Sequence, residues 1–190
     1  MLLHPLPHGG EFFRTIAPLL AQGRAVIAPD YPGYGQSDPI GFTPSIRVYA
    51  QAVMDARRSC ERPGAADLLG FHTGCLVGVE LSLRFPAAFR RLVQIDVPFF
   101  GPWERRTLLG KQWAKDGFVA AFSYAAEQQF PRIDIDCLVL ATHGDLLQPS
   151  RDAARAIRPC RYIEFPQITA PALENGAAEI AEVVLGFLDN

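Results

Sequence analysis

Residues 68–74 read Leu-Leu-Gly-Phe-His-Thr-Gly, and this short stretch is the strongest indication of the fold. An apolar run over residues 65–69 leads into it, and apolar residues at helical spacing lead out of it as far as Arg84. A buried strand that passes through Gly-x-His-x-Gly directly into a helix predicts a sharp strand-to-helix turn. His72 is expected at the tip of that turn.

The rest of the chain repeats the same alternation of apolar runs and helical patterns. Strands are expected at residues 1–3, 25–28, 65–69, 92–95, 137–141 and 162–165, and helices at 11–22, 45–58, 73–84, 117–130, 151–157 and 176–188. Alternation of this kind is typical of a parallel sheet with crossover helices. We therefore expect an α/β protein, a three-layer α/β sandwich with a mostly parallel sheet, formed by residues 1–190 as a single domain.

Composition excludes several classes of protein. Of the 190 residues, 49% are hydrophobic, the net charge is −2, and no basic stripe is present, so neither nucleic acid nor an anionic membrane is an expected partner. The cysteines are widely spaced and read as small buried hydrophobes (Cys60, Cys75, Cys137 and Cys160). Without a visible signal peptide or membrane-spanning run, a cytoplasmic protein is expected.

Three motifs in order carry a resemblance to a known family. They are Leu2-Leu3-His4, then Asp30-x-x-Gly33-x-Gly35-x-Ser37, then Gly70-x-His72-x-Gly74. In this order and spacing the chain resembles the α/β-hydrolase family, in its single-domain esterase, epoxide hydrolase and dehalogenase branch. The resemblance implies that the chain starts within the third strand of that fold, so that it is N-terminally truncated or its start is misplaced. It also implies that residues 98–132 form a small helical lid.

The chain departs from the family pattern where the catalytic groups would stand. In the family, the sharp strand-to-helix turn is a nucleophile elbow, and His72 occupies the position of its nucleophile. Pro5 stands where the family usually has a glycine. In the loop after the strand 137–141, the family's catalytic carboxylate would align with Leu147, and Asp145 is the nearest carboxylate. Thr169 stands where the family has its general-base histidine, before the closing helix. A conventional Ser-His-Asp triad is therefore not expected.

A site centred on His72 remains a hypothesis. An imidazole titrates near neutrality and can act as a nucleophile or a general base. The histidines and two carboxylates all fall at strand ends or just after them, which would place them on one rim of the sheet (His4, His8, His72, His143, Asp96 and Asp145). An oxyanion hole would use the N–H of Thr73 and one near Leu6. No metal-ligand spacing occurs, so neither a metal nor a cofactor is expected.

Two functions stay open at this point. The first is hydrolysis of a small apolar ester or lactone, with His72 at the centre, Asp145 or Asp96 orienting it, and His143 on the same rim. The second is a non-catalytic binding or interaction protein, in which His72 is only a polar occupant of the turn. Aromatic residues of the lid would form an apolar ceiling for a small-molecule ligand, or would pack on the sheet or in a homodimer contact (Phe99, Phe100, Trp103, Trp113, Phe118 and Phe122).

Overall fold

The chain folds around a five-stranded sheet in which every pairing is parallel. The computed structural model describes residues 1–112 and 117–190. The strands lie in the order of the sequence: β1 (Leu2–Leu3), β2 (Ala66–Phe71), β3 (Phe89–Ile95), β4 (Asp136–His143) and β5 (Cys160–Thr169). Such a sheet needs a crossover between successive strands, and helices supply most of these connections.

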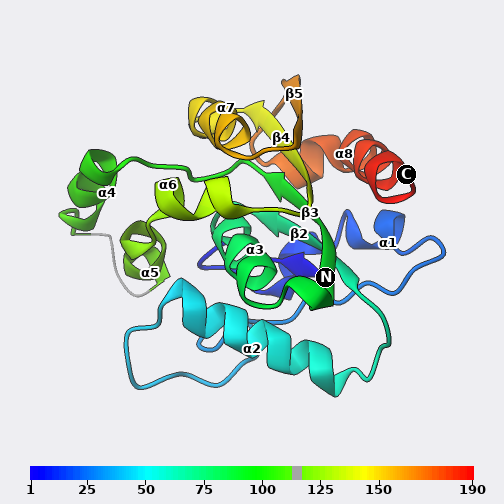
Figure 1. Ribbon diagram of the computed structural model, residues 1–190, viewed down its shortest axis with the longest axis horizontal. Helices are drawn as coiled ribbons and strands as arrows, with labels where there is room; N and C mark the ends of the chain where they lie inside the picture. The colour runs from blue at the N-terminus through cyan, green and yellow to red at the C-terminus, as the bar shows by residue number, and fades with distance from the viewer. Residues whose placement is uncertain (113–116) are drawn as a thin grey trace.

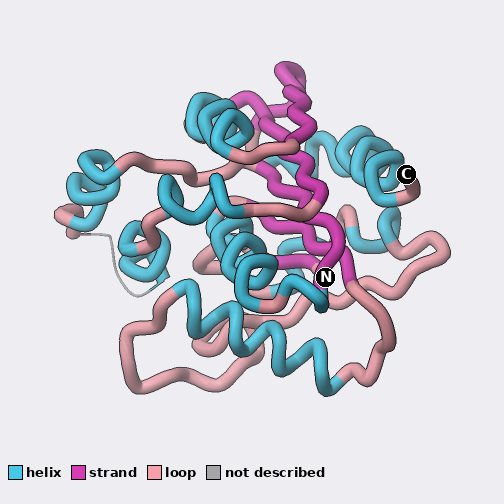
Figure 2. Tube along the Cα trace, viewed as in Figure 1, coloured by secondary structure: helices cyan, strands magenta, loops and turns pink. Residues whose placement is uncertain are grey.

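Helices cover both faces of the sheet, as Figures 1 and 2 show. The α-helices are α1 (Ala17–Leu20), α2 (Ile46–Ser59), α3 (Thr73–Arg84), α4 (Pro102–Leu109), α5 (Gly117–Ser123), α6 (Ala126–Gln129), α7 (Leu147–Ala156) and α8 (Ala172–Leu188), with short 3₁₀ turns η1 (Gly10–Phe13), η2 (Pro86–Ala88) and η3 (Phe130–Arg132). In Figure 1, α2, α3 and α7 lie on one side of the strands, and α1 and α8 lie on the other. The expected three-layer α/β sandwich is therefore the observed fold.

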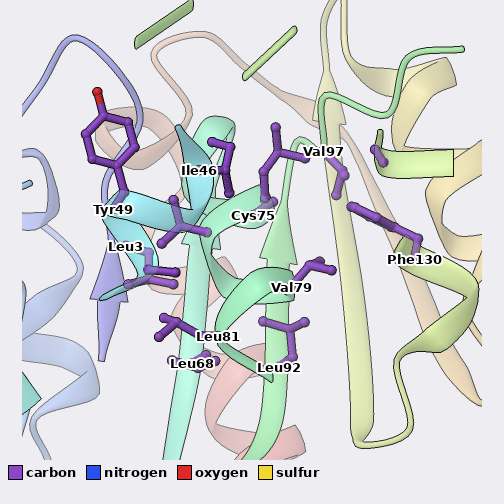
Figure 3. Close-up of a cluster of buried hydrophobic side chains, with 14 of the residues drawn as sticks. Leu3, Ile46, Tyr49, Leu68, Cys75, Val79, Leu81, Leu92, Val97 and Phe130 are labelled. Carbon is purple, nitrogen blue, oxygen red and sulfur yellow. The ribbon is translucent and has the colours of Figure 1, made fainter. Parts of the chain in front are cut away.

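Alternation along the strands divides the core into two layers. On β2, Leu68 packs towards α2 and α3, whereas Leu69 packs towards α1 and α8. Figure 3 shows the first layer, where Leu68 and Leu92 meet residues of α3 such as Val79 and Leu81. Burial on both faces explains why the central strands read as near-continuous apolar runs.

Several expected elements differ from the structure, among them the helix over 117–130, which is divided at residues 124–125 into α5 and α6. Residues 11–22 do not form one helix, since η1 and α1 are separated by a turn. Pro18 lies in the first turn of α1, and a proline inside a longer helix would remove a hydrogen bond and clash with the preceding turn. Residues 25–28 are not a strand, although Leu2 N–H donates to Ile27 O at 2.8 Å, because one bond does not make a ladder.

The closing helix begins earlier than residue 176. Gly176 has non-helical angles (φ −140°, ψ 18°) within α8, so the helix contains a kink at the point where the sequence pattern starts. A Cβ at this glycine would lie 2.2 Å from the side chain of Ile168, which shows how closely α8 approaches the end of β5. No helix within the described residues is long and apolar enough to cross a membrane.

Candidate functional site

His72 lies in a tight turn between β2 and α3. Its backbone has φ 48° and ψ −118°, a left-handed conformation that a side chain with a Cβ seldom adopts. The flanking glycines are required by packing, because a Cβ at Gly74 would lie 1.9 Å from Leu3 O and one at Gly70 would lie 2.6 Å from Cys75 N. The sequence prediction of a sharp turn with His72 at its tip is thus confirmed.

The environment of His72 keeps its imidazole neutral. Burial lowers the pKa of His72 from its ordinary value of 6.5, and the carboxylate of Asp96 opposes that effect. His8, an exposed residue of the loop after β1, adds a further small lowering of the same pKa. Among the described residues, no ion pair within 4.0 Å joins His72 to Asp96. The carboxylate therefore acts on the imidazole electrostatically and without direct contact.

Asp96 follows β3 directly and is held by the neighbouring strand. Its Oδ1 accepts the Thr142 N–H at 2.7 Å, and its Oδ2 accepts the Thr142 hydroxyl at 2.7 Å. Like His72, Asp96 has a positive φ, of 51°. Thr142 was not singled out from the sequence, although a hydroxyl at the end of a buried strand is the signal that could have found it. Asp96 therefore carries a buried, oriented carboxylate at the same edge of the sheet as His72.

His143 is the last residue of β4, next to the Thr142 that holds Asp96, and Asp145 lies in the loop that follows. His143 and Asp145 are both exposed, and neither makes a hydrogen bond to His72 in the described part of the chain. His143 is in register with Thr169 on β5. Thr169 stands where the family has its general-base histidine, and the pairing of β4 with β5 places His143 next to it. Spacing along the chain did not reveal this neighbourhood.

Leu6 and Thr73, the two residues expected to donate to an oxyanion, are hydrogen-bonded to each other. Leu6 N–H donates to Thr73 Oγ1 at 2.8 Å, so this N–H is satisfied within the protein. Thr73 is the first residue of the 12-residue α3, and the first N–H groups of a helix have no partner inside it. The N-terminus of α3 also favours negative charge. Of the two, the N–H of Thr73 is the better placed to meet an oxyanion.

His4 and Asp30 hold the loops beside the site and do not lie in it. His4 is fully buried, stacks on Tyr31 at 3.8 Å between ring centroids, and accepts the Tyr31 N–H at Nε2 (3.1 Å). Asp30 accepts the N–H groups of Gly10 (2.6 Å) and Gln36 (2.8 Å), which lower its pKa. The interpretation of Asp30 as a turn-stabilising carboxylate is confirmed.

The aromatic residues of the expected ceiling differ in their surroundings, and the ceiling itself stays a prediction. Trp103 lies on α4 and is 77% exposed. Phe99 packs on Phe130 at 5.1 Å, and Phe122 lies 6.1 Å from both Phe100 and Phe118, so these rings gather within residues 98–132. Trp113 lies outside the described residues.

Helix α5 lies over the loop that follows β1. A Cβ at its first residue, Gly117, would lie 2.4 Å from the side chains of both Leu6 and Tyr34. A cavity of about 400 Å³ instead opens at the opposite end of the strands, between Met1, Arg24 and Asp67. No group of three or more His, Cys, Asp or Glu side chains able to hold a metal ion occurs in the described ranges.

Comparison with known proteins agrees with this architecture. Residues 1–146 match the family described as alpha/beta hydrolase fold. The chain therefore belongs to the α/β-hydrolase fold family. It is 28% identical over 187 residues to the pimeloyl-[acyl-carrier protein] methyl ester esterase of Klebsiella pneumoniae (strain 342), covering 97% of this chain and 66% of that protein. The chain thus spans just under two thirds of the length of this relative.

Solved structures show the same fold. An esterase from Thermogutta terrifontis superposes with a TM-score of 0.82 at 15% identity, covering 99% of this chain and 88% of that one. The enol-lactonase from Burkholderia xenovorans LB400 gives a TM-score of 0.79 at 17% identity, with 100% and 90% covered. At these identities the likeness establishes the fold and leaves the chemistry to be argued from the site.

Proposed function

We propose that this protein hydrolyses the ester or lactone bond of a small apolar substrate, with His72 as the central catalytic group in the position of the family nucleophile. The single observation that carries the proposal is the left-handed backbone of His72 at the turn between β2 and α3. This turn presents the imidazole at the carboxyl ends of the strands, where open α/β sheets bind their ligands.

The environment of the ring supports nucleophilic chemistry. Because burial lowers the pKa of His72, the ring is neutral at pH 7 and keeps a free electron pair. A ring nitrogen attacks the carbonyl carbon, and the oxygen becomes an oxyanion near the N–H of Thr73 at the start of α3. Collapse expels the alcohol and leaves an acyl-imidazole, which water then hydrolyses to the acid and free His72.

The remaining groups of the rim supply charge and proton transfer. The buried carboxylate of Asp96 favours the cationic imidazole that forms during the attack. His143 lies in register with Thr169 and takes the proton-transfer role, with Asp145 two residues further along the exposed loop. The triad is thus degenerate, and residues 98–132 act as a small lid whose α5 packs against Leu6.

The experiment is hydrolysis of p-nitrophenyl acetate by the wild type, His72→Ala and His143→Ala. We expect His72→Ala to lose about 10²-fold or more of the rate. Acid-quenched wild type should carry an acetyl group on the peptide that contains His72. Free imidazole at the same concentration is the control for uncatalysed attack. Equal rates for wild type and His72→Ala, or no rate above free imidazole, would refute the proposal.

A second candidate is a binding protein without catalysis. The observation that favours it is the hydrogen bond from Leu6 N–H to Thr73 Oγ1, which satisfies one of the two expected oxyanion donors inside the protein. On this account a small apolar ligand, such as a lactone, binds and is recovered intact. Calorimetry with the lactone, followed by chromatography of the ligand, separates binding with turnover from binding alone.

A further inference from the structure

Two cysteines lie side by side at the start of neighbouring strands. Cys137 of β4 and Cys160 of β5 are direct partners in the parallel register, and they form the first pair of that ladder. Cys137 is buried in the core layer on the face of the sheet that carries α2, α3 and α7, and Cys160 packs against the same layer. The two side chains therefore leave the sheet on the same face.

Their spacing suits a covalent link. Adjacent strands lie about 4.8 Å apart, and disulfides join residues whose Cα atoms are roughly 4.4–6.8 Å apart. The Cβ atoms of such a pair would need to approach by about 1 Å to reach the usual disulfide separation. The pair opens the β4–β5 ladder, so no earlier pairing joins these two strands, although Asp136 still pairs with Arg91 of β3.

The two thiols differ in reactivity. The neighbouring Cys137 side chain lowers the pKa of Cys160, and the same interaction, together with burial, raises the pKa of Cys137; the Cys160 thiol itself donates to Arg161 O at 3.2 Å. Cys160 is half-buried and can meet a small reagent, whereas Cys137 is only 2% exposed. The pair thus combines a more acidic, accessible thiol with a protected neighbour, as in sites that resolve an oxidised cysteine.

A buried amide adjoins the protected thiol. Gln94 of β3 is fully buried, donates from Nε2 to Cys137 Sγ at 3.4 Å, and leaves its Oε1 without a partner among the described residues. Burying an amide in an apolar core is costly unless its groups are bonded. A donor aimed at sulfur stabilises negative charge there, which is the charge that develops when Cys137 reacts.

We propose that Cys137 and Cys160 form an oxidation site at which a peroxide converts the two thiols into a disulfide between β4 and β5. The Cys160 thiolate attacks one peroxide oxygen, the O–O bond breaks, and a sulfenic acid and hydroxide form. Hydroxide takes up the proton that the Cys160 thiol released, giving water. Cys137 sulfur then attacks Cys160 Sγ, the S–O bond breaks, and the leaving hydroxide takes the Cys137 proton as a second water.

This site is separate from the proposed hydrolase site. Cys137 stands at the amino end of β4 and His143 at its carboxyl end, so the two sites occupy opposite edges of the sheet. Loss of hydrolysis in a His72 variant therefore has no bearing on the pair Cys137 and Cys160. The proposal about this pair is tested by mass spectrometry and not by an activity assay.

The experiment treats the folded protein with one equivalent of hydrogen peroxide, alkylates the remaining thiols and maps peptides without reduction. We expect a Cys137–Cys160 linked peptide, a mass loss of about 2 Da in the intact chain, and reversal by dithiothreitol. In Cys160→Ser the link should be absent, and in Cys137→Ser a sulfenic acid at Cys160 should be trapped by dimedone.

Cys60→Ser is the matched control, because Cys60 is an exposed thiol outside the pair, and it should form the link as the wild type does. The wild type alone decides the matter even if a variant fails to fold. Oxidation of Cys60 or Cys160 in the wild type without any Cys137–Cys160 peptide would overturn the proposal.

Discussion

At the scale of single residues, the histidines of this chain have separate tasks although they lie near the same strand ends. His72 occupies a strained turn with its ring stacked on Phe71 at 4.7 Å between centroids, whereas His4 is buried in the core against Tyr31. A neutral His4 suits this place, because its Nε2 accepts a backbone N–H and would lose that bond on protonation. Position along a strand end therefore does not define a catalytic role.

The buried state of His4 predicts how stability depends on pH. Burial lowers its folded pKa below 6.5, so on acidification the unfolded chain binds the proton first. The contribution of His4 is fully present above the unfolded pKa and is lost as the pH falls through the folded pKa. Urea unfolding between about pH 7.5 and 5 should show falling stability, with a shallower fall in His4→Gln.

His143→Gln is the control for this measurement, since it replaces an exposed histidine in place of the buried one. A flat free energy of unfolding for the wild type across this range would contradict the expectation.

At the scale of elements, the ends of β3 and β4 are joined by side chains as well as by the sheet. Asp96 N–H donates to Leu140 O at 3.0 Å, and the Asp96 carboxylate accepts two bonds from Thr142. A carboxylate buried at 5% exposure requires such partners, because an unpaired buried charge is strongly unfavourable. The two hydrogen bonds from Thr142 therefore hold the Asp96 carboxylate in the position from which it acts on His72.

Removing the hydroxyl tests this link. Thr142→Val keeps the shape of the side chain but leaves Asp96 Oδ2 without its donor, so we expect a loss of about 1–3 kcal/mol in the free energy of unfolding. Thr107→Val, at an exposed position on α4, should change it by less than about 0.5 kcal/mol. Chemical denaturation of both variants is the measurement, and equal stabilities would refute a structural role for the bond.

In the molecule as a whole, the sheet separates two apolar core layers, one on each of its faces. Consecutive residues of β2 serve different layers, Leu68 towards α2 and α3, and Leu69 towards α1 and α8. Both are buried, at 1% and 3% exposure. The rim that carries His72 is stable only if both layers hold the strands in place.

The doubly covered sheet predicts equal sensitivity on its two faces. Leu68→Ala and Leu69→Ala should each lower the free energy of unfolding by about 2–5 kcal/mol, because each leaves a cavity in a packed layer. Leu109→Ala, at a position that is 38% exposed, should have a much smaller effect. Thermal or urea unfolding of the three variants is sufficient, and tolerance of one of the two β2 substitutions would show a sheet covered on one side only.

The α/β sandwich and the turn at His72 could be predicted from the amino-acid sequence. Both follow from local pattern, because buried strands and amphipathic helices have distinct periods and the crowded turn requires Gly70 and Gly74. The prediction failed where local pattern was weak, as at residues 25–28, where apolar residues suggested a strand that no ladder completes.

The contacts between polar groups could not be predicted in this way and are known only from the folded structure. Thr142 holding Asp96, Leu6 N–H bonded to Thr73, and Cys137 beside Cys160 each join residues at least 23 positions apart in the sequence. Such contacts depend on the order and register of the strands, and a hydrogen bond is made or lost within less than an ångström. Spacing along the chain places a residue at an edge of the sheet, and packing across the sheet chooses its partner.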